Sequence, residues 1–416
     1  MKITRVATAV VQANFDYTFV RVFTDEGVYG TGECFMAPGI AAIARDLGEV
    51  LVGCNPLEVN PCRMRLMAAA SGSGGHAGAG IAYNAISGLE TALWDLYGKA
   101  LGQPVSRLLG GAFRDSIDVY ADLHAGGELA SLDRVMRYRT PFWDSHDGMT
   151  HAKEFYWEAS EDEAWSLEAA IERGREAIEA GYRRVKFDLD VFADGREAAD
   201  RFVRRRDIDL IRERTLGLRQ ALGDDIDIAL DCHWRFDVPS ALEIARAVAP
   251  ARPMWLEDPV PPDSSALAAV AKSSPVPIAT GENTYLVEGF LQLVQSGSAH
   301  ILTPDIQKTG GLLEGLRIAD LAARHFLPIA PHCIASPLGF LATVHVCAAS
   351  SNVSCIEFHG SDVPFWDELV EHDEPIIANG RVRVPTSPGI GVELDLSVVE
   401  RYSAPGEPVF DGVAVR

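Results

Sequence analysis

The sequence predicts an α/β protein in which a closed barrel of strands and helices follows a smaller α+β domain. From about residue 116, short β-rich runs alternate with amphipathic helical runs, a pattern typical of a parallel sheet. Eight such strand candidates joined by helices fit a closed barrel better than an open doubly wound sheet. The length of 416 residues also exceeds what one hydrophobic core usually organises, so we expect a second domain.

The first part of the chain predicts the smaller domain. Residues 3–33 alternate apolar and polar side chains around the turn sequence Asp25-Glu26-Gly27, which indicates antiparallel strands. Residues 81–101 carry apolar side chains at helical spacing, and a glycine follows them. This part should therefore form a small α+β unit.

Two segments interrupt these patterns. The stretch 71–82 opens with the Gly-rich run SGSGGHAGAG, which is either a flap over a site or a linker. The polar and aromatic insertion 128–165 lies between the first and second barrel strands, where it could act as a lid or an oligomer contact. Together with residues 14–36, these segments would determine which substrate is accepted.

Charge and composition narrow the function classes. A formal net charge of −22 argues against a nucleic-acid partner, because such binding depends on clustered lysine and arginine. The start MKITRVATAVV lacks the apolar core of a signal peptide, and no apolar run reaches the roughly 18 residues that span a bilayer. The seven cysteines include no CxxC pair and no zinc spacing. We expect a cytoplasmic protein with reduced thiols and no membrane partner.

Ionisable residues end nearly every expected barrel strand, at the edge where barrel active sites are built. In chain order they are Lys186, Asp231 with His233, Glu257, Glu282, Asp305, His332 and Glu357. From Asp231 onward they recur at intervals of about 25 residues, the length of one strand, one helix and two loops. Any one of them could cap a helix or form a surface ion pair, but six in phase indicate a shared site.

Three of these residues, Asp231, Glu257 and Glu282, would converge from adjacent strands. Carboxylates so close repel one another unless a hard cation lies between them. Oxygen ligands without cysteine favour Mg²⁺ over zinc. The sequence therefore predicts a magnesium site.

Two histidines could supply acid–base chemistry beside this metal. Asp305 precedes His332 by one strand, so its carboxylate can fix the imidazole tautomer and raise its basicity. A basic histidine near Mg²⁺ suits removal of a proton from carbon, with the metal stabilising the enediolate that forms. His233 lies two residues beyond Asp231, on the same face of an extended strand, and could protonate a leaving hydroxyl or only support a metal ligand.

Several short motifs stand at or near the expected strand ends and in the helical run of the first unit. They are DCHWR at 231–235, WLEDP at 255–259, TGEN at 280–283, PD and GG at 304–311, and ALWDLYGKALG at 92–102. These motifs resemble those of the enolase superfamily, most closely its mandelate racemase subgroup. Within the subgroup, Asp231-x-His233 together with Pro331-His332-Cys333 is most similar to galactonate dehydratase and, in part, to mannonate dehydratase. Many other members lack a histidine at the position of His233.

The resemblance implies a modified (β/α)7β barrel at residues 116–379. It implies a capping α+β domain at 1–115, completed by the C-terminal tail at about 380–416, and a homo-oligomer. It also implies Mg²⁺ held by the three carboxylates, the His332–Asp305 pair with His332 as the base, and Glu357 near the substrate carboxylate.

One position departs from the family pattern. Racemases and cycloisomerases of the family carry Lys-x-Lys on the second barrel strand, whereas this chain has Lys186-Phe187-Asp188. An aspartate thus stands at the position of the second lysine, which argues against a second base on the opposite face and against racemisation. Lys186 either contacts the substrate carboxylate or the metal ligands, or forms an ion pair with Asp188 or Asp231.

The favoured function is Mg²⁺-dependent dehydration of a sugar acid, an aldonate such as galactonate, gluconate or mannonate. His332 would take the C2 proton, and His233 would assist loss of the C3 hydroxyl to give a 2-keto-3-deoxy acid. One alternative is an epimerase, racemase or cycloisomerase that uses the same enediolate with Lys186 and His332 on opposite faces. An alternative of another class is a non-catalytic barrel that binds a carboxylate.

Overall fold

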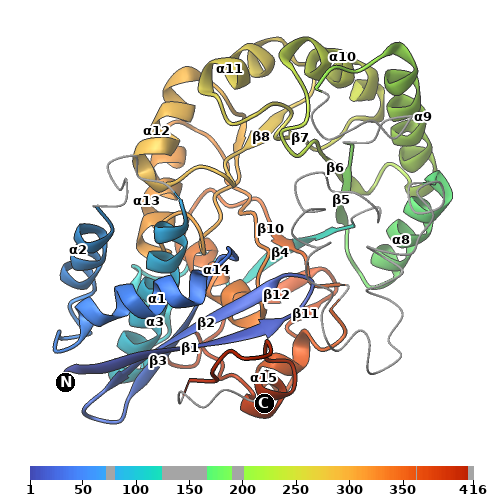
Figure 1. Ribbon diagram of the computed structural model, residues 1–416. Coiled ribbons are helices and arrows are strands. Elements are labelled where there is room, and N and C mark those ends of the chain that lie inside the picture. The colour runs from blue at the N-terminus through green and yellow to red at the C-terminus, as the bar shows by residue number, and fades with distance from the viewer. Residues whose placement is uncertain (72–79, 124–165, 190–200, 362, 411–416) are drawn as a thin grey trace.

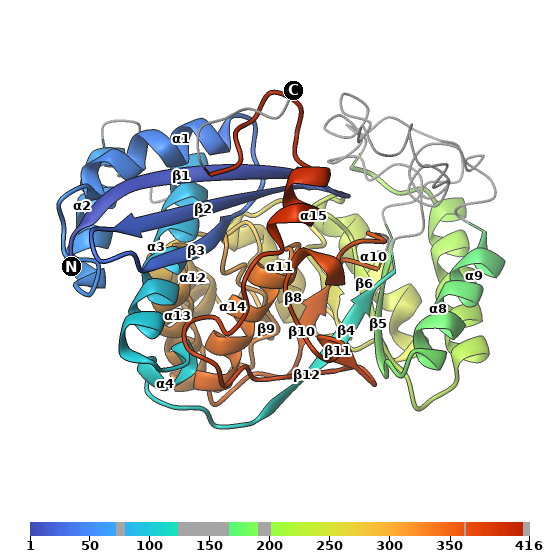
Figure 2. The ribbon, with the colours of Figure 1, turned by 90° about the horizontal axis from the view of Figure 1, so that it is seen from below.

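The computed structural model describes residues 1–71, 80–123, 166–189, 201–361 and 363–410. Most of the expected flap in 71–82 and all of the insertion 128–165 lie outside these residues. The described chain forms an N-terminal unit and a barrel, and Figures 1 and 2 show that the N-terminal sheet and its helices lie against the barrel.

The N-terminal unit begins with an antiparallel sheet of β1 (Ile3–Gln12), β2 (Asp16–Thr24) and β3 (Tyr29–Cys34). It continues with α1 (Ile40–Gly48), the 3-10 turn η1 (Glu49–Leu51), α2 (Val59–Ala70), α3 (Ile81–Leu101) and α4 (Val105–Leu108). Helix α3 packs directly on β3. The two elements lie so close that a Cβ at Gly30 would be only 2.0 Å from the carbonyl oxygen of Ala92, so this position requires glycine. The predicted strands and helix of this unit are confirmed.

The barrel sheet consists of parallel strands in sequence order, closed by the pairing of the last strand with the first. Its strands are β4 (Ser116–Asp122), β5 (Arg184–Asp188), β6 (Asp227–Asp231), β7 (Leu256–Glu257), β8 (Ile278–Thr280), β9 (Ile301–Leu302) and β10 (Ile356–Phe358). One of the eight strand candidates, LPIAPHC at 327–333, is reduced to parallel bridges of Ile329 with Leu302 and Val353. These bridges complete the ring between β9 and β10. Pro328 and Pro331 flank Ile329 and lack the N–H groups that a longer ladder needs.

Helices connect successive barrel strands and form the outer ring in Figure 1. They are α8 (Leu167–Glu179), α9 (Arg205–Leu222), α10 (Val238–Val248) with the turn η5 (Ala249–Ala251), α11 (Ser264–Ser273), α12 (Leu286–Ser296), α13 (Leu312–Arg324) and α14 (Pro337–Ala349). Because β10 is followed by the C-terminal segment instead of another barrel helix, the predicted (β/α)7β fold is confirmed.

The C-terminal segment contacts both units. It contains the turn η6 (Asp367–Leu369), the strands β11 (Ile377–Ala378) and β12 (Arg381–Arg383), and helix α15 (Leu396–Arg401). Strand β12 pairs antiparallel with β4, whereas Ser403 forms a bridge with Val11 of β1. We propose a domain boundary at 115/116, where β4 begins, and assign the tail from about residue 380 to the N-terminal unit.

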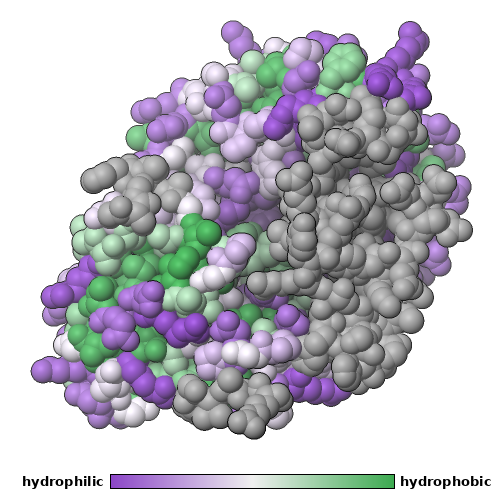
Figure 3. All heavy atoms as spheres, viewed as in Figure 1, coloured by the Kyte–Doolittle hydropathy of each residue, from purple (hydrophilic) through white to green (hydrophobic). Residues whose placement is uncertain are grey.

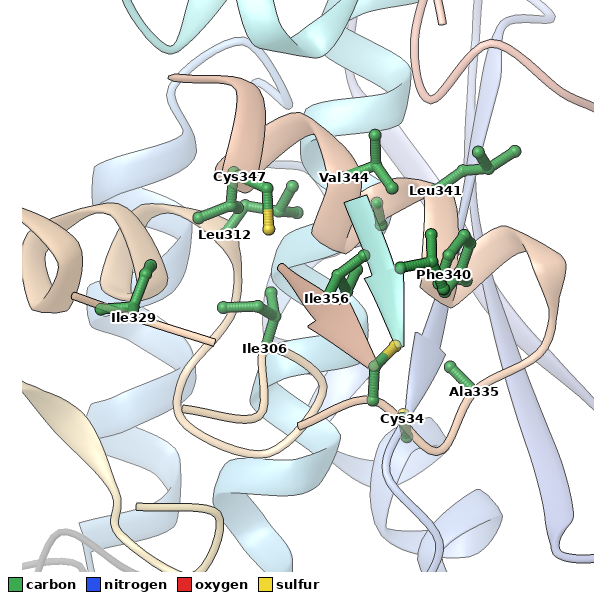
Figure 4. Close-up of a cluster of buried hydrophobic side chains, with 14 of the residues drawn as sticks. Cys34, Ile306, Leu312, Ile329, Ala335, Phe340, Leu341, Val344, Cys347 and Ile356 are labelled. Atoms are coloured by element: carbon green, nitrogen blue, oxygen red, sulfur yellow. The ribbon is translucent and has the colours of Figure 1, made fainter. Parts of the chain in front are cut away.

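The hydrophobic core is continuous between the two units. Figure 4 shows part of it, in which Cys34 of β3 lies in the same cluster as Ala335, Phe340 and Ile356 of the barrel. All the residues of α14 are buried, since this helix lies between the barrel strands and the N-terminal unit. The two units are thus packed together beside the strand ends that carry the ionisable residues.

The outer surface is mostly polar in the view of Figure 3, apart from hydrophobic residues that gather over the N-terminal unit around α1. Over the described residues, none of the helices combines the length and apolar character needed to cross a bilayer. The seven cysteines are free thiols, as expected.

Candidate active site

The carboxylates of Asp231, Glu257 and Glu282 meet at the ends of β6, β7 and β8. All three are buried, and one oxygen from each lies within 4.8 Å of the others. Oε1 of Glu257 has no hydrogen-bond partner among the described residues, and burial raises the pKa of this side chain well above its usual value. Three crowded carboxylates with an unsatisfied oxygen form a site that suits a divalent cation.

A histidine–carboxylate pair lies beside this triad. Nδ1 of His332 is 2.7 Å from Oδ2 of Asp305, and its Nε2 is 3.7 Å from Glu282 and 3.8 Å from Glu357. Burial alone would lower the pKa of His332, but the carboxylates of Glu282, Glu357 and Asp305 raise it to about 10. With Asp305 accepting from Nδ1–H, Nε2 is the atom directed toward the acidic triad.

Lys186 lies among four carboxylates, two of which also belong to the acidic triad. Its Nζ is 2.6 Å from Glu357 and 2.9 Å from Asp231, with Asp122 at 3.3 Å and Glu257 at 3.5 Å. Burial lowers the pKa of this lysine, but Asp122, Glu257, Glu357 and Asp231 raise it well above its usual value. The expected ion pair with Asp231 is therefore present, and Lys186 is held as an ammonium.

Glu357 joins the lysine to the loop that carries His332. Its Oε1 contacts Lys186, and its Oε2 accepts a hydrogen bond from the backbone N–H of Cys333 at 2.9 Å. Burial opposes ionisation of Glu357, but Lys186 and His332 lower its pKa well below the usual value. Glu357 therefore stays ionised beside the pair formed by His332 and Asp305.

His233 reaches the triad by a different route from the one expected. Strand β6 ends at Asp231, and His233 has a φ of 43°, so the residues do not alternate along an extended strand. The turn lets the backbone N–H of His233 donate to Asp231 at 3.0 Å. Its ring lies between two carboxylates, with Nδ1 3.9 Å from Asp188 and Nε2 3.8 Å from Asp231.

Sequence reasoning missed Asp122, which lies at the end of β4 and contacts Lys186. The residue lies near the end of the first strand candidate, SIDVYADLH at 116–124, and that position could have identified it. Phe35 was also missed, although its ring centroid lies 6.2 Å from that of His332. It comes from the N-terminal unit, and no periodic pattern links that unit to the barrel site.

Comparisons with known proteins agree with this architecture. Residues 3–110 match the family described as mandelate racemase / muconate lactonizing enzyme, N-terminal domain, and residues 169–398 match the family described as enolase C-terminal domain-like. The chain is 37% identical to D-xylonate dehydratase of Haloferax volcanii, over 99% of this chain and 91% of that protein. It is 30% identical to D-galactonate dehydratase of Ralstonia nicotianae, over 97% of this chain and 96% of that protein.

Solved structures show the same relationship. A mandelate racemase/muconate lactonizing enzyme-like protein from Rubrobacter xylanophilus superposes with a TM-score of 0.88 and 36% identity, covering 98% of this chain and 99% of that one. The chain therefore belongs to the mandelate racemase / muconate lactonizing enzyme family of the enolase superfamily.

Proposed function

We propose that this chain is a hydro-lyase that dehydrates an aldonate to a 2-keto-3-deoxy acid. The observation that carries this proposal is the pair of histidines at the two ends of the acidic triad. His332 lies 3.7 Å from Glu282, and His233 lies 3.8 Å from Asp231. Elimination of water requires one base at C2 and one acid at C3, and this arrangement offers both. The dehydratase names of two relatives support the same reaction.

Asp231, Glu257 and Glu282 would hold the cation, which we propose to be Mg²⁺. The donor set offers only oxygen atoms, and oxygen ligands suit a hard cation. When bound, such a cation would attract the substrate carboxylate and increase the acidity of the neighbouring C–H bond.

The protein side chains then divide the proton transfers. Glu282 is the main cause of the high pKa of His332, so a cation held by Glu282 would lower that pKa and leave the ring neutral. Nε2 of the neutral His332 would then take the proton from C2, and the electron pair of that bond would form the enediolate of the acid. The enediolate re-forms the carboxylate as the C2=C3 bond forms and the C3–O bond breaks, while His233 gives a proton to the departing hydroxyl. The resulting enol tautomerises to the 2-keto-3-deoxy acid, with water as the other product. Asp305 stabilises the imidazolium through its contact with Nδ1.

Lys186 supports this reaction as a positive charge. Its ammonium lies within 3.5 Å of four carboxylates, and a charged lysine cannot accept a proton. Glu357 contacts both Lys186 and the backbone of the loop that carries His332, and it thereby fixes the positions of these two groups relative to each other. The environment of Lys186 therefore argues against the two-base epimerase alternative.

The experiment is a screen of five- and six-carbon aldonates, in all C2 and C3 configurations, for 2-keto-3-deoxy products with added Mg²⁺. D-Xylonate is the first substrate to test, because the relative with that name shares 37% identity. Each C2 epimer is incubated separately, and we expect only one of the two to react. Interconversion of epimers as fast as product formation would select the epimerase instead. A homo-oligomer and a cytoplasmic location stay predictions.

A further inference from the structure

Two buried carboxylates of the N-terminal unit have no part in the mechanism described above. Glu33 lies on β3 and Glu90 on α3, and both side chains reach across to the barrel. Oε1 of Glu33 accepts from the N–H of Ser336 at 3.1 Å, and its Oε2 accepts from the Ser336 hydroxyl at 2.5 Å and the Gly339 N–H at 3.1 Å. Glu90 accepts from the N–H groups of Leu312 and Leu313 at 2.7 and 3.2 Å.

Each carboxylate thus binds the first turn of a barrel helix, Glu33 that of α14 and Glu90 that of α13. A helix start presents free N–H groups and a positive dipole end, so it favours a negative partner. Both carboxylates lie so close to the barrel backbone that only glycine fits at one barrel position beside each of them. A Cβ at Gly339 would lie 2.5 Å from Oε2 of Glu33, and one at Gly311 would lie 2.2 Å from Oε2 of Glu90.

The two helices directly follow the two members of the histidine–carboxylate pair. Helix α13 begins after the loop that carries Asp305, and α14 begins after the loop that carries His332. Further contacts fix both loops, since the Gly310 N–H donates to Ser87 of α3 at 2.8 Å and Trp366 donates to the Ala335 carbonyl at 2.9 Å.

Burial makes these carboxylates expensive to keep charged. It raises the pKa of Glu33 and of Glu90 to about 7, although the hydrogen bonds from the helix starts act in the opposite direction. Apolar side chains could join the two units without this desolvation cost. A carboxylate that accepts several directed hydrogen bonds instead fixes the position of the backbone more strictly than apolar packing does.

We propose that Glu33 and Glu90 are positioning residues through which the N-terminal unit holds His332 and Asp305 in the geometry for proton abstraction. The inference rests on the proposed function, because it assigns His332 as the base. It adds that the N-terminal unit acts on the rate of C2 proton removal.

The test uses isosteric variants and a matched control. The variants are Glu33→Gln, Glu90→Gln and the milder Ser336→Ala, which removes only the hydroxyl donor to Glu33. Lys99→Met is the control, because it breaks the ion pair of Lys99 with Asp95 within α3, at 2.8 Å, and the ion pair of Lys99 with Glu393, and neither partner belongs to the two loops. With the aldonate that the wild type dehydrates fastest, we expect kcat to fall roughly 10- to 100-fold in both Gln variants, with KM within about twofold. Ser336→Ala should show a smaller fall, and Lys99→Met should match the wild type.

Two further measurements separate positioning from general damage. Exchange of the C2 proton with D₂O should slow in parallel with kcat. The downfield ¹H NMR resonance of the His332 Nδ1–H, assigned by its loss in His332→Asn, should shift in the Gln variants and not in the control. Gln variants that match Lys99→Met in kcat and in this resonance would overturn the positioning role. A wild type that exchanges no C2 proton with any aldonate would instead overturn the proposed function, while the resonance still tests the positioning role.

Discussion

Replacement of Lys186 by methionine tests whether this residue is the charge that stabilises the buried carboxylates. The ammonium lies between 2.6 and 3.5 Å from four of them, and the side chain is only 1% exposed. Methionine fills a similar volume but leaves these groups without their cation. Breaking a buried charge pair from one side costs about 3–5 kcal/mol, so we expect the metal-free variant to lose stability by this amount.

Mg²⁺ should reverse part of this loss. Two of the four carboxylates, Asp231 and Glu257, belong to the acidic triad, so the ammonium and the metal compete for them. In the wild type, Mg²⁺ at 100 times its Kd should stabilise the protein by about 2.7 kcal/mol. In Lys186→Met the same Mg²⁺ concentration should stabilise it more, because the competing charge is absent.

The assay is urea unfolding followed by tryptophan fluorescence, with EDTA and with saturating Mg²⁺, for the wild type and the variant. Lys99→Met is a suitable control, because it removes a lysine from a less buried ion pair. A metal-free variant within about 1 kcal/mol of the wild type would show that Lys186 does not supply the compensating charge. Equal Mg²⁺ stabilisation in both proteins would refute the competition.

Three other predictions address the metal, the histidines and pH. Glu257→Gln should keep the fold but lose most Mg²⁺ affinity in calorimetric titration, since one of three anionic ligands becomes neutral; unchanged affinity would remove Glu257 from the ligand set. His332→Asn should abolish exchange of the C2 proton with D₂O, whereas His233→Asn should retain exchange but block dehydration; wild-type exchange in His332→Asn would disprove the base assignment. Burial lowers the pKa of His345 to about 4, and because a His in the unfolded chain titrates near 6.5, the unfolded state binds the proton first as the pH falls. The stability that the neutral ring provides is thus fully present above about pH 6.5 and decreases by about 3 kcal/mol toward pH 4. In His345→Gln the change in stability between pH 7 and pH 4 should lack this contribution of about 3 kcal/mol, and urea midpoints at several pH values would measure the difference from the wild type.

The strand ends of the barrel could be located from the sequence alone. Parallel strands bring their carboxyl ends to one edge, so a regular interval of ionisable residues translates directly into proximity. This is why Asp231, Glu257, Glu282, Asp305 and His332 all meet in one buried cluster. Their roles in metal binding and catalysis stay predictions.

Contacts that depend on long-range packing could not be located in this way. Glu33 and Glu90 lie in segments whose periodic pattern indicates only a strand and a helix, and nothing local shows that their side chains bind a distant helix start. The sequence predicted that His233 lies beside Asp231. The reason given for this proximity was wrong, because a left-handed turn replaces the expected extended strand. Such a conformation depends on tertiary contacts more than on local propensity.

The aspartate at position 188 connects the charge balance of the site with the choice of reaction. A lysine there would add a second cation beside Lys186 and repel a protonated His233. Asp188 instead lies 3.9 Å from Nδ1 of His233, while Asp231 lies 3.8 Å from Nε2. Carboxylates on both sides of an imidazole stabilise its protonated form, which is the form that a leaving hydroxyl needs. If His233 is the acid that we propose, Asp188 both replaces the second lysine of the family pattern and favours the protonated ring, and both effects support dehydration over racemisation.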